Sequence, residues 1–465
     1  MSDEGETRGT KRKHLPDETR ARFILGDNLE HLSCIIYKGL EEGVPGKTIM
    51  QCGAPLDLLY TRPRDALELA LDKLNAYPFA DVPAHWRELY EEASLYQAAM
   101  ILKYRAAVER GRRNIIERLR PRVRIEGGDW TQEIVAVLDR GMQLSGATGR
   151  KKLYENVFQQ LESLFPEKTL NGIPAAFHTV TPCDLATEQP VTLSREVLGL
   201  IGFQHWLDNE RRPLIIAGAL AEWPATQLWK DPRYLLGLTL GGRRLVPVEV
   251  GRLYTDDDWG QRLIPFHSFM TDYLLPEHPT EIGYLAQHDL FDHIPALKAD
   301  VITPDYCWTT PPISEDEATL KTAGLGTVQQ LDEPLVNAWL GPSGTRTPLH
   351  TDPYHNILCQ VIGFKYVRLY PPAETACLYP QGIDDKGVNM ENTSQVDISH
   401  HAARALGRDW DPDAVRVIEE QFPKFAEARY EEAILKPGEC LYVPLGWWHY
   451  VESLSTSFSV SFWWN

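Results

Sequence analysis

The sequence contains no run of roughly eighteen or more apolar residues, so it predicts no transmembrane helix. Its first residues also lack the charged and apolar regions of a signal peptide, and we expect a soluble, intracellular protein. The seven cysteines are scattered singly, without a Cys-x-x-Cys pair. This spacing argues against a zinc finger and against a disulfide framework.

Basic residues are outnumbered by acidic ones, 47 Lys and Arg against 65 Asp and Glu, which leaves a net charge of -18. Such a balance argues against a broad nucleic-acid surface, since that needs clustered cations to replace condensed counterions. A basic polypeptide is a more natural partner. One short basic cluster, residues 10–14, suits nuclear import, so we expect a nuclear protein, a cytoplasmic one, or both.

The first third of the chain has the periodicity of helices. After a polar tail, residues 1–18, apolar residues recur at spacings of three and four through residues 19–168. Helices are expected over residues 64–77, 86–110 and 153–165, and a further helix is capped by Asp129 or Thr131. These segments predict a helical domain without a repeat of fixed length.

Residues 169–465 change to short apolar or alternating runs that Pro and Gly interrupt. Strands are expected over residues 212–218, 244–250 and 282–287, and residues 356–370 read as two strands joined at Gly363. The polar, acidic segment 315–333 is expected to be a mobile insertion. Many short strands favour a double-sheet jelly roll, which can hold a metal and a small ligand between its sheets. The fold class is therefore α+β, with a helical domain before a double-stranded β-helix.

The pair His350 and Asp352 is the strongest sign of chemistry in the chain. In an extended strand the side chains of residues i and i+2 leave the same face, so both can aim at one point. A later strand that carries His449 can add a third ligand. Two imidazoles and one carboxylate on one face of a metal suit non-haem Fe(II), and the open positions can take a 2-oxo acid and O2.

Lys365 is a cation among strand residues. An outward, solvated lysine is one interpretation. An inward lysine would need an anion to offset its burial, and a dicarboxylate cosubstrate would be such an anion.

Several stretches of residues 172–465 resemble those of JmjC-domain Fe(II)/2-oxoglutarate oxygenases, whose fold is cupin-like. The resemblance is closest to the subgroup of bifunctional peptidases and arginyl-hydroxylases, also called lysine-specific demethylases 8. The matching stretches are residues 283–288, 337–339, 348–353, 365–370, 392–397, 422–425, 448–451 and 457–464.

The resemblance implies a role for each site residue. His350, Asp352 and His449 would ligate Fe(II). The 2-oxoglutarate would be held by Lys365, which pairs with its distal carboxylate, and through hydrogen bonds by Thr347, Asn356 and Tyr284. The family usually has Ser where this chain has Thr347, and Thr keeps the hydroxyl. A substrate side chain would meet a wall of four residues, namely Glu249, Tyr254, Gln287 and Trp339.

A carboxylate and aromatic faces suit a guanidinium better than a methylated ammonium, so hydroxylation of arginine in a protein is the leading hypothesis for the function. The alternative is lysine demethylation on histones, which shares every metal and cosubstrate residue. Cleavage of histone tails is a weaker hypothesis, because a single metal held by two histidines and one carboxylate offers no evident base to activate water. A non-catalytic cupin-like scaffold would not need the intact triad and Lys365.

The expected partner is therefore an arginine-containing, basic protein, with a histone or another chromatin protein as one candidate. We expect a monomer, because the chain stops at Asn465 directly after its last strand. The helices through which related hydroxylases dimerise would follow that point.

Overall fold

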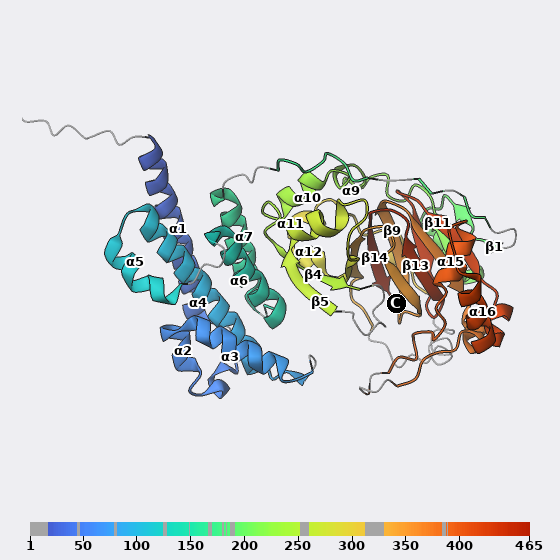
Figure 1. The fold of residues 1–465 in the computed structure, drawn as a ribbon, viewed down its shortest axis with the longest axis horizontal. Helices are drawn as coiled ribbons and strands as arrows, with labels where there is room; N and C mark the ends of the chain where they lie inside the picture. Colours follow the sequence, from blue (N-terminus) through green and yellow to red (C-terminus); the bar gives the residue numbers. More distant parts are fainter. Residues whose placement is uncertain are drawn as a thin grey trace, which may run out of the picture. The chain divides into compact units, whose positions relative to one another are not determined.

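The structure is a computed structural model, and its elements are drawn in Figure 1. It describes residues 17–43, 47–78, 81–123, 128–147, 149–165, 170–178, 181–182, 184–186, 191–251, 260–311, 330–383, 387 and 389–465. The contacts divide the chain into two compact units. One comprises residues 1–168 with 243–245, and the other comprises residues 169–242 with 246–465.

The first unit is helical. Its α-helices are α1 (Asp17–Glu42), α2 (Leu56–Thr61), α3 (Pro63–Asn75), α4 (Ala84–Glu109), α5 (Arg113–Leu119), α6 (Trp130–Ser145) and α7 (Lys151–Leu164), with short 3-10 turns η1 (Ile49–Cys52) and η3 (Arg120–Arg122). Helix α4 packs against α1, α3 and α6 and forms the centre of the unit. The expected helices are confirmed as α3, α4, α6 and α7.

Local chemistry sets the ends of α6. The Asp129 side chain accepts hydrogen bonds from the backbone amides of Thr131 and Gln132, so it is the N-cap that the sequence predicts. The helix ends at Gly146, which has a left-handed conformation with φ of 82°. Apolar residues of this helix, such as Ile134 and Leu138, are fully buried.

The second unit combines helices with strands. Its helices are α8 (Leu200–Asn209), α9 (Ala225–Leu228), α10 (Pro232–Leu238), α11 (Phe266–Phe269), α12 (Leu290–His293), α13 (Pro295–Lys298), α15 (Ser399–Ala405) and α16 (Pro412–Gln421). Short turns complete the set: η5 (Met270–Leu274), η6 (Asp305–Trp308), η7 (Pro372–Cys377) and η8 (Pro423–Glu427).

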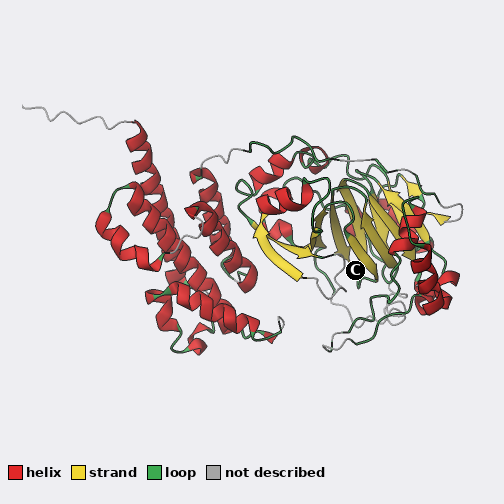
Figure 2. Cartoon of the chain, in the orientation of Figure 1, coloured by secondary structure: helices red, strands yellow, loops and turns green. Residues whose placement is uncertain are grey.

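In the described part of the second unit and at its boundary, fourteen strands form two sheets. They are β1 (Val191–Thr192), β2 (Arg195–Glu196), β3 (Leu214–Ile216), β4 (Leu245–Val250), β5 (Gly260–Pro265), β6 (Gly283–His288), β7 (Leu335–Gly341), β8 (Arg346–His350), β9 (His355–Ile362), β10 (Lys365–Tyr370), β11 (Glu431–Leu435), β12 (Cys440–Val443), β13 (Trp448–Ser453) and β14 (Ser457–Trp464). The sheet orders are β1-β11-β10-β13-β8 and β2-β3-β12-β9-β14-β7-β6-β4-β5. Figure 2 shows helices alone in the described part of residues 1–168 and helices together with strands in the second unit, which confirms the α+β class.

Apolar side chains from both sheets meet in one inner core. Leu358 of β9 and Leu441 of β12 come from the larger sheet, and Val367 of β10 and Val451 of β13 come from the smaller one. The larger sheet therefore lies against the smaller one, and the site described below opens within this layer.

Strand β14 shows how the sequence sets the layers. Phe458, Val460 and Phe462 belong to a second core that also holds helix residues such as Leu235 of α10. The intervening serines point to the opposite face, where Ser461 Oγ accepts a hydrogen bond from Trp339 Nε1 at 2.8 Å. Because the side-chain period of a strand is two, this alternation of serine and apolar residues gives one sheet two different faces.

Gly363 joins β9 to β10, as expected, with φ of 75°. A Cβ atom at this position would lie 2.2 Å from the carbonyl oxygen of Thr456, so a side chain cannot be accommodated without a shift of the backbone. The expected strands over 212–218, 244–250 and 282–287 are confirmed as β3, β4 and β6. The expected insertion at 315–333 lies mostly outside the described residues. Among those residues, no helix is long and apolar enough to cross a membrane.

Candidate active site

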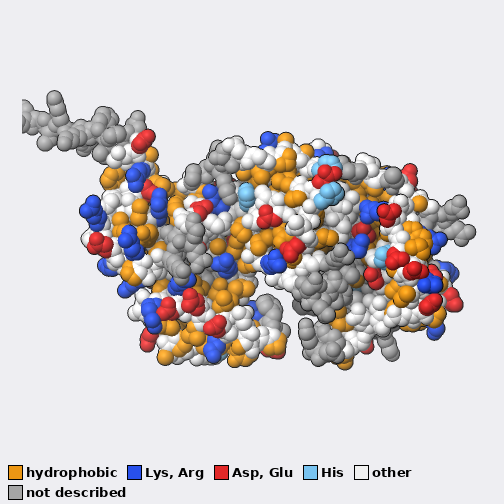
Figure 3. Space-filling view, in the orientation of Figure 1, with side chains coloured by type: hydrophobic (Ala, Val, Ile, Leu, Met, Phe, Trp, Pro, Cys, Tyr) orange, Lys and Arg blue, Asp and Glu red, His pale blue; other side chains and the backbone are white. Residues whose placement is uncertain are grey.

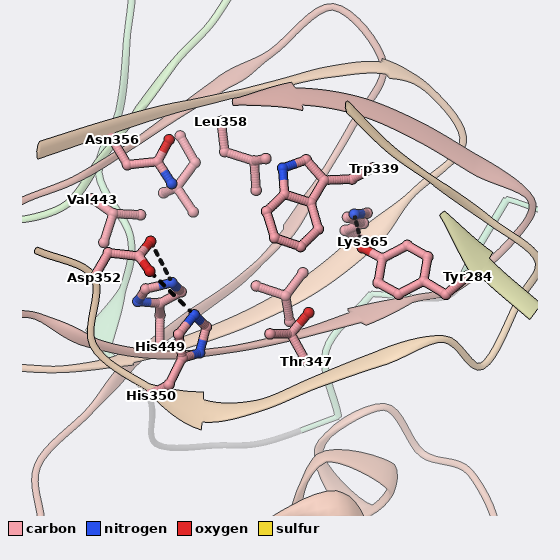
Figure 4. Close-up of a pocket in the computed structure, with 12 residues that line it drawn as sticks. Tyr284, Trp339, Thr347, His350, Asp352, Asn356, Leu358, Lys365, Val443 and His449 are labelled. Atoms are coloured by element: carbon pink, nitrogen blue, oxygen red, sulfur yellow. Dashed lines mark hydrogen bonds and ion pairs between the residues drawn. The ribbon is translucent and has the colours of Figure 1, made fainter. Parts of the chain in front are cut away.

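Three potential metal ligands come together where β8 and β13 lie side by side. His350 is the last residue of β8, and His449 of β13 is its direct antiparallel partner. Asp352 follows β8 rather than continuing it, which corrects the expectation of one extended strand through both residues. Its Oδ1 lies 3.5 Å from His350 Nε2, and its Oδ2 lies 3.5 Å from His449 Nε2 (Figure 4).

The backbone fixes the orientation of both imidazoles. Nδ1 of His350 lies 2.8 Å from the carbonyl oxygen of Pro348, and Nδ1 of His449 lies 3.1 Å from that of Trp447. Because a carbonyl oxygen only accepts, each Nδ1 carries the proton and each Nε2 keeps its lone pair in the neutral ring. Hydrogen bonds of this kind are the usual support for metal-binding histidines.

The ligand atoms of His350, Asp352 and His449 all lie within 4.8 Å of one another. Within the described part of the chain, no other His, Cys, Asp or Glu residues form such a group. Two imidazole nitrogens and one carboxylate match the donor set that non-haem Fe(II) prefers. The residues present therefore fit this metal.

Electrostatics favour an ionised carboxylate at the centre of the group. Burial alone would raise the pKa of Asp352, but hydrogen bonds with His350 and His449, together with their charge, hold that pKa well below its usual range. For His350, burial lowers the pKa, and the hydrogen bond and charge of Asp352 raise it by more. Asp352 is thus an anion ready for a cation.

Lys365 occupies the other end of the same pocket. It is the first residue of β10 and is only 2% exposed. Its Nζ donates to the hydroxyl of Tyr284 at 3.2 Å, and none of the described carboxylates forms an ion pair with it. Burial lowers the pKa of Lys365 from 10.5 to about 7. A buried ammonium without a counterion is costly, so this position favours an anionic ligand.

Tyr284, Thr347 and Asn356 line the pocket between these two ends, as Figure 4 shows. Tyr284 comes from β6, and the Thr347 side chain of β8 partly offsets the rise that burial causes in the pKa of its hydroxyl. Asn356 begins the inward face of β9, and its Oδ1 is buried without a hydrogen-bond partner. The amide N–H2 of Asn356, the two hydroxyls and the unpaired cation are donors that the carboxylates of a small dicarboxylate could engage.

A bulge brings Thr347 and His350 to the same pocket. Residues three apart in a regular strand point to opposite faces. Here the pairing of β13 with β8 shifts, so that His449 faces His350 while Val451, two residues on, faces Thr347. The additional residue on β8 turns both side chains inward, which is a common role of bulges beside active sites.

Apolar residues complete the pocket, and sequence reasoning missed them. They are Leu358, Leu441, Val443 and Val451. Each lies two residues from an expected site residue or from another wall residue, as Leu358 follows Asn356 and Val451 follows His449. Because alternate residues of a strand point to the same face, this spacing of two could have identified them from the sequence. These side chains keep the pocket dry between its two charged ends.

The four residues expected to meet the substrate are not all brought together. Trp339 of β7 lines the pocket, and its ring lies 6.1 Å from that of Tyr284. Glu249 of β4 is half-buried and pairs across the strands with Tyr284, but it is not among the lining residues. Gln287 is exposed and has φ of 43°. Tyr254 lies outside the described residues.

Comparison with known proteins agrees with this geometry. Residues 202–465 match the model of the cupin-like domain family. The chain is 32% identical to lysine-specific demethylase 8 of Xenopus tropicalis, over 90% of this chain and 89% of that protein. It is 34% identical to lysine-specific demethylase JMJ30 of Arabidopsis thaliana, over 86% of this chain and 85% of that one. It is also 27% identical to the human bifunctional peptidase and (3S)-lysyl hydroxylase JMJD7, over 55% and 77%. With this metal-ligand group and these relatives, the chain belongs to the JmjC oxygenase family of cupin-like proteins.

Proposed function

We propose that the chain is an Fe(II)- and 2-oxoglutarate-dependent oxygenase that acts on a basic side chain of a protein. The observation that carries this proposal is a single pocket with three metal ligands at one end and the unpaired cation Lys365 at the other. His350, Asp352 and His449 would hold Fe(II). The metal, when bound, supplies oxidation by O2 coupled to decarboxylation of the 2-oxo acid.

The protein's own residues position the cosubstrate. Lys365 pairs with its distal carboxylate, and the Tyr284 hydroxyl, already 3.2 Å from Lys365 Nζ, adds a hydrogen bond to the same carboxylate. The hydroxyl of Thr347, which lines the same pocket, donates a further hydrogen bond to the cosubstrate. Asn356 lies nearer the metal ligands and holds the other end. The apolar wall excludes water from the space between.

For the substrate, the relatives fit lysine demethylation better than the arginine hydroxylation that the sequence first indicated. The relatives from Xenopus tropicalis, Danio rerio and Arabidopsis thaliana are all named lysine-specific demethylases. Trp339 supports this candidate, because an aromatic face in the pocket wall attracts a methylated ammonium. Histones would then be the protein partner, and the nucleus the place of action.

Arginine hydroxylation remains a second candidate because of Glu249. Its charge contributes, after burial, to the raised pKa of Tyr284, so the carboxylate lies close to the cosubstrate end of the pocket. A carboxylate there could receive a guanidinium in bidentate fashion. The arginine candidate thus depends on one acidic side chain beside the pocket, whereas the lysine candidate depends on Trp339 within it.

Mass spectrometry separates the two candidates. The protein, with Fe(II) and 2-oxoglutarate, is incubated with histone-tail peptides that carry methylated lysine and with unmodified arginine-containing peptides. Demethylation removes CH2 from the first, and hydroxylation adds one oxygen to the second. Asp352→Ala is the inactive control. Oxygen addition on arginine without loss of CH2 would reject the demethylase proposal, and neither product, with no 2-oxoglutarate turnover, would reject an oxygenase of basic side chains.

A further inference from the structure

A basic surface lies on the helical unit of this otherwise acidic protein. From Arg112 to Arg122 the chain has five arginines and a single carboxylate, Glu117. The arginines are Arg112, Arg113, Arg118, Arg120 and Arg122, all exposed, and we call them the α5 arginine face. Figure 3 shows Lys and Arg side chains gathered over the part of the chain that Figure 1 labels α5.

The positive charge of this face is largely uncompensated. Nearby acids on α1 are already engaged, because Asp27 and Glu30 form ion pairs with Arg110. Arg112 reaches Glu30 only at 3.6 Å. Among the residues described, no carboxylate forms an ion pair with the other four arginines of the face. Like charges held this close repel one another and destabilise the fold unless a partner supplies negative charge.

The two arginines at the start of α5 do not stabilise the helix, whereas Arg118 in its last turn complements the helix dipole. Arg112 is the N-cap of α5 and Arg113 its first residue, and the first turn contains no acidic side chain. Cations at a helix N-terminus oppose the helix dipole, where Asp or Glu would stabilise it. Arginines at the start of α5 that do not stabilise the helix indicate a role in binding rather than in folding.

The composition of the face indicates the kind of partner. Between Gly111 and Val123, all of which the structure describes, there is no aromatic residue and no exposed large apolar side chain. Protein interfaces usually need such apolar anchors, and single-stranded nucleic acids need aromatic rings on which bases stack. Guanidinium groups without apolar anchors or aromatic rings beside them suit a phosphate backbone, because each can bind a phosphate in bidentate fashion.

We propose that the α5 arginine face binds the phosphate backbone of double-stranded nucleic acid, independently of sequence. It is a local exception to the acidic charge of the chain. The proposal does not depend on which side chain the active site oxidises. If the substrate is a histone, the face also provides a second contact with chromatin.

The test is fluorescence anisotropy of the full chain with a labelled DNA duplex across a range of salt concentrations. The triple variant Arg113→Glu, Arg118→Glu, Arg120→Glu is expected to weaken binding by about tenfold or more. Its logarithmic salt dependence should flatten by about 3 units, since each phosphate contact contributes about 0.9. The corresponding Arg→Lys triple should keep most of the binding, because the contacts read charge and not bases.

A matched control reverses three exposed cations elsewhere: Lys38→Glu, Arg62→Glu and Arg416→Glu, whose side chains are 78%, 66% and 66% exposed. Both triple variants change the net charge equally, and circular dichroism checks that each one folds. Equal losses in the two variants, or no measurable binding of the duplex by the wild type, would overturn the proposal. Tighter binding of poly-glutamate or single-stranded RNA than of the duplex would overturn it as well.

Discussion

His350 and His449 are direct partners across the antiparallel strands β8 and β13, and their ring centroids lie 4.1 Å apart. Neither residue depends on a mobile loop for its position. Each Nδ1 is held by a carbonyl oxygen two residues earlier in the chain, so the two Nε2 atoms converge on Asp352. The geometry of the two histidines is therefore set by the ladder of the sheet itself, and Asp352 joins them from the segment that follows β8.

This arrangement predicts that either histidine is needed for metal binding. His350→Ala and His449→Ala should each weaken binding of Mn(II), a stand-in for Fe(II), by about 100-fold or more. Isothermal titration calorimetry measures the dissociation constants. His205→Ala, a change at an exposed position of α8, is the control and should bind as the wild type does. Unchanged binding in both active-site variants would refute the metal assignment.

Lys365 should destabilise the free protein and stabilise its complex with 2-oxoglutarate. Lys365→Met removes the buried charge and keeps a side chain of similar length, so the free protein should unfold at a higher temperature than the wild type. The same variant should lose the thermal stabilisation that 2-oxoglutarate gives the wild type, and its KM for 2-oxoglutarate should rise by about 100-fold. Differential scanning fluorimetry with and without the ligand tests both parts. An unaltered response to 2-oxoglutarate would exclude Lys365 from its binding.

The binding of 2-oxoglutarate should weaken as pH rises, because Lys365 must be protonated to pair with a carboxylate. In the free protein its pKa is lowered to about 7, so the affinity should fall as pH rises through that value. Between about pH 7 and 10.5 the unfolded chain holds a proton that the folded protein has lost. The contribution of Lys365 to the free energy of unfolding therefore increases with pH in this window. Titrations of 2-oxoglutarate from pH 6 to pH 9 check the first trend, which Lys365→Met should abolish.

The sequence was sufficient for most of the elements and for the grouping of three potential metal ligands, but less so for the residues that line the pocket between them. Spacing identified His350, Asp352 and His449, and turn residues such as Gly363 located the strand ends. Strand β9 is buried on both faces, so alternation alone could not tell which face lines the pocket, and Leu358 was missed. The bulge that turns Thr347 toward His350 depends on the pairing of two strands distant in sequence. No local pattern encodes such a shift.

Gly363 should be required for stability rather than for chemistry. Gly363→Ala places a Cβ 2.2 Å from the Thr456 carbonyl oxygen and strains a residue with positive φ. We expect a loss on the order of 2 kcal/mol in the free energy of unfolding, measured with urea. Gly382→Ala is the matched control, since a Cβ there meets nothing within 4 Å, and its effect should stay within about 0.5 kcal/mol. Equal stability of the two variants would contradict this account of the turn.

Gly341 should be required for tight binding of 2-oxoglutarate but not for binding of the metal. A Cβ atom at this position would lie 2.7 Å from Cδ2 of Tyr284 and 2.7 Å from Cγ2 of Thr345. Gly341→Ala should therefore push the Tyr284 ring away from Lys365 and raise the KM for 2-oxoglutarate by about tenfold. The dissociation constant for Mn(II) should not change, because the atoms nearest to the new methyl group belong to Thr345 and Tyr284 and not to a metal ligand. Gly237→Ala, with open space around its Cβ, is the control. A parallel loss of metal binding in Gly341→Ala would mean that the substitution disturbs the whole sheet, and that Tyr284 does not act separately on the cosubstrate.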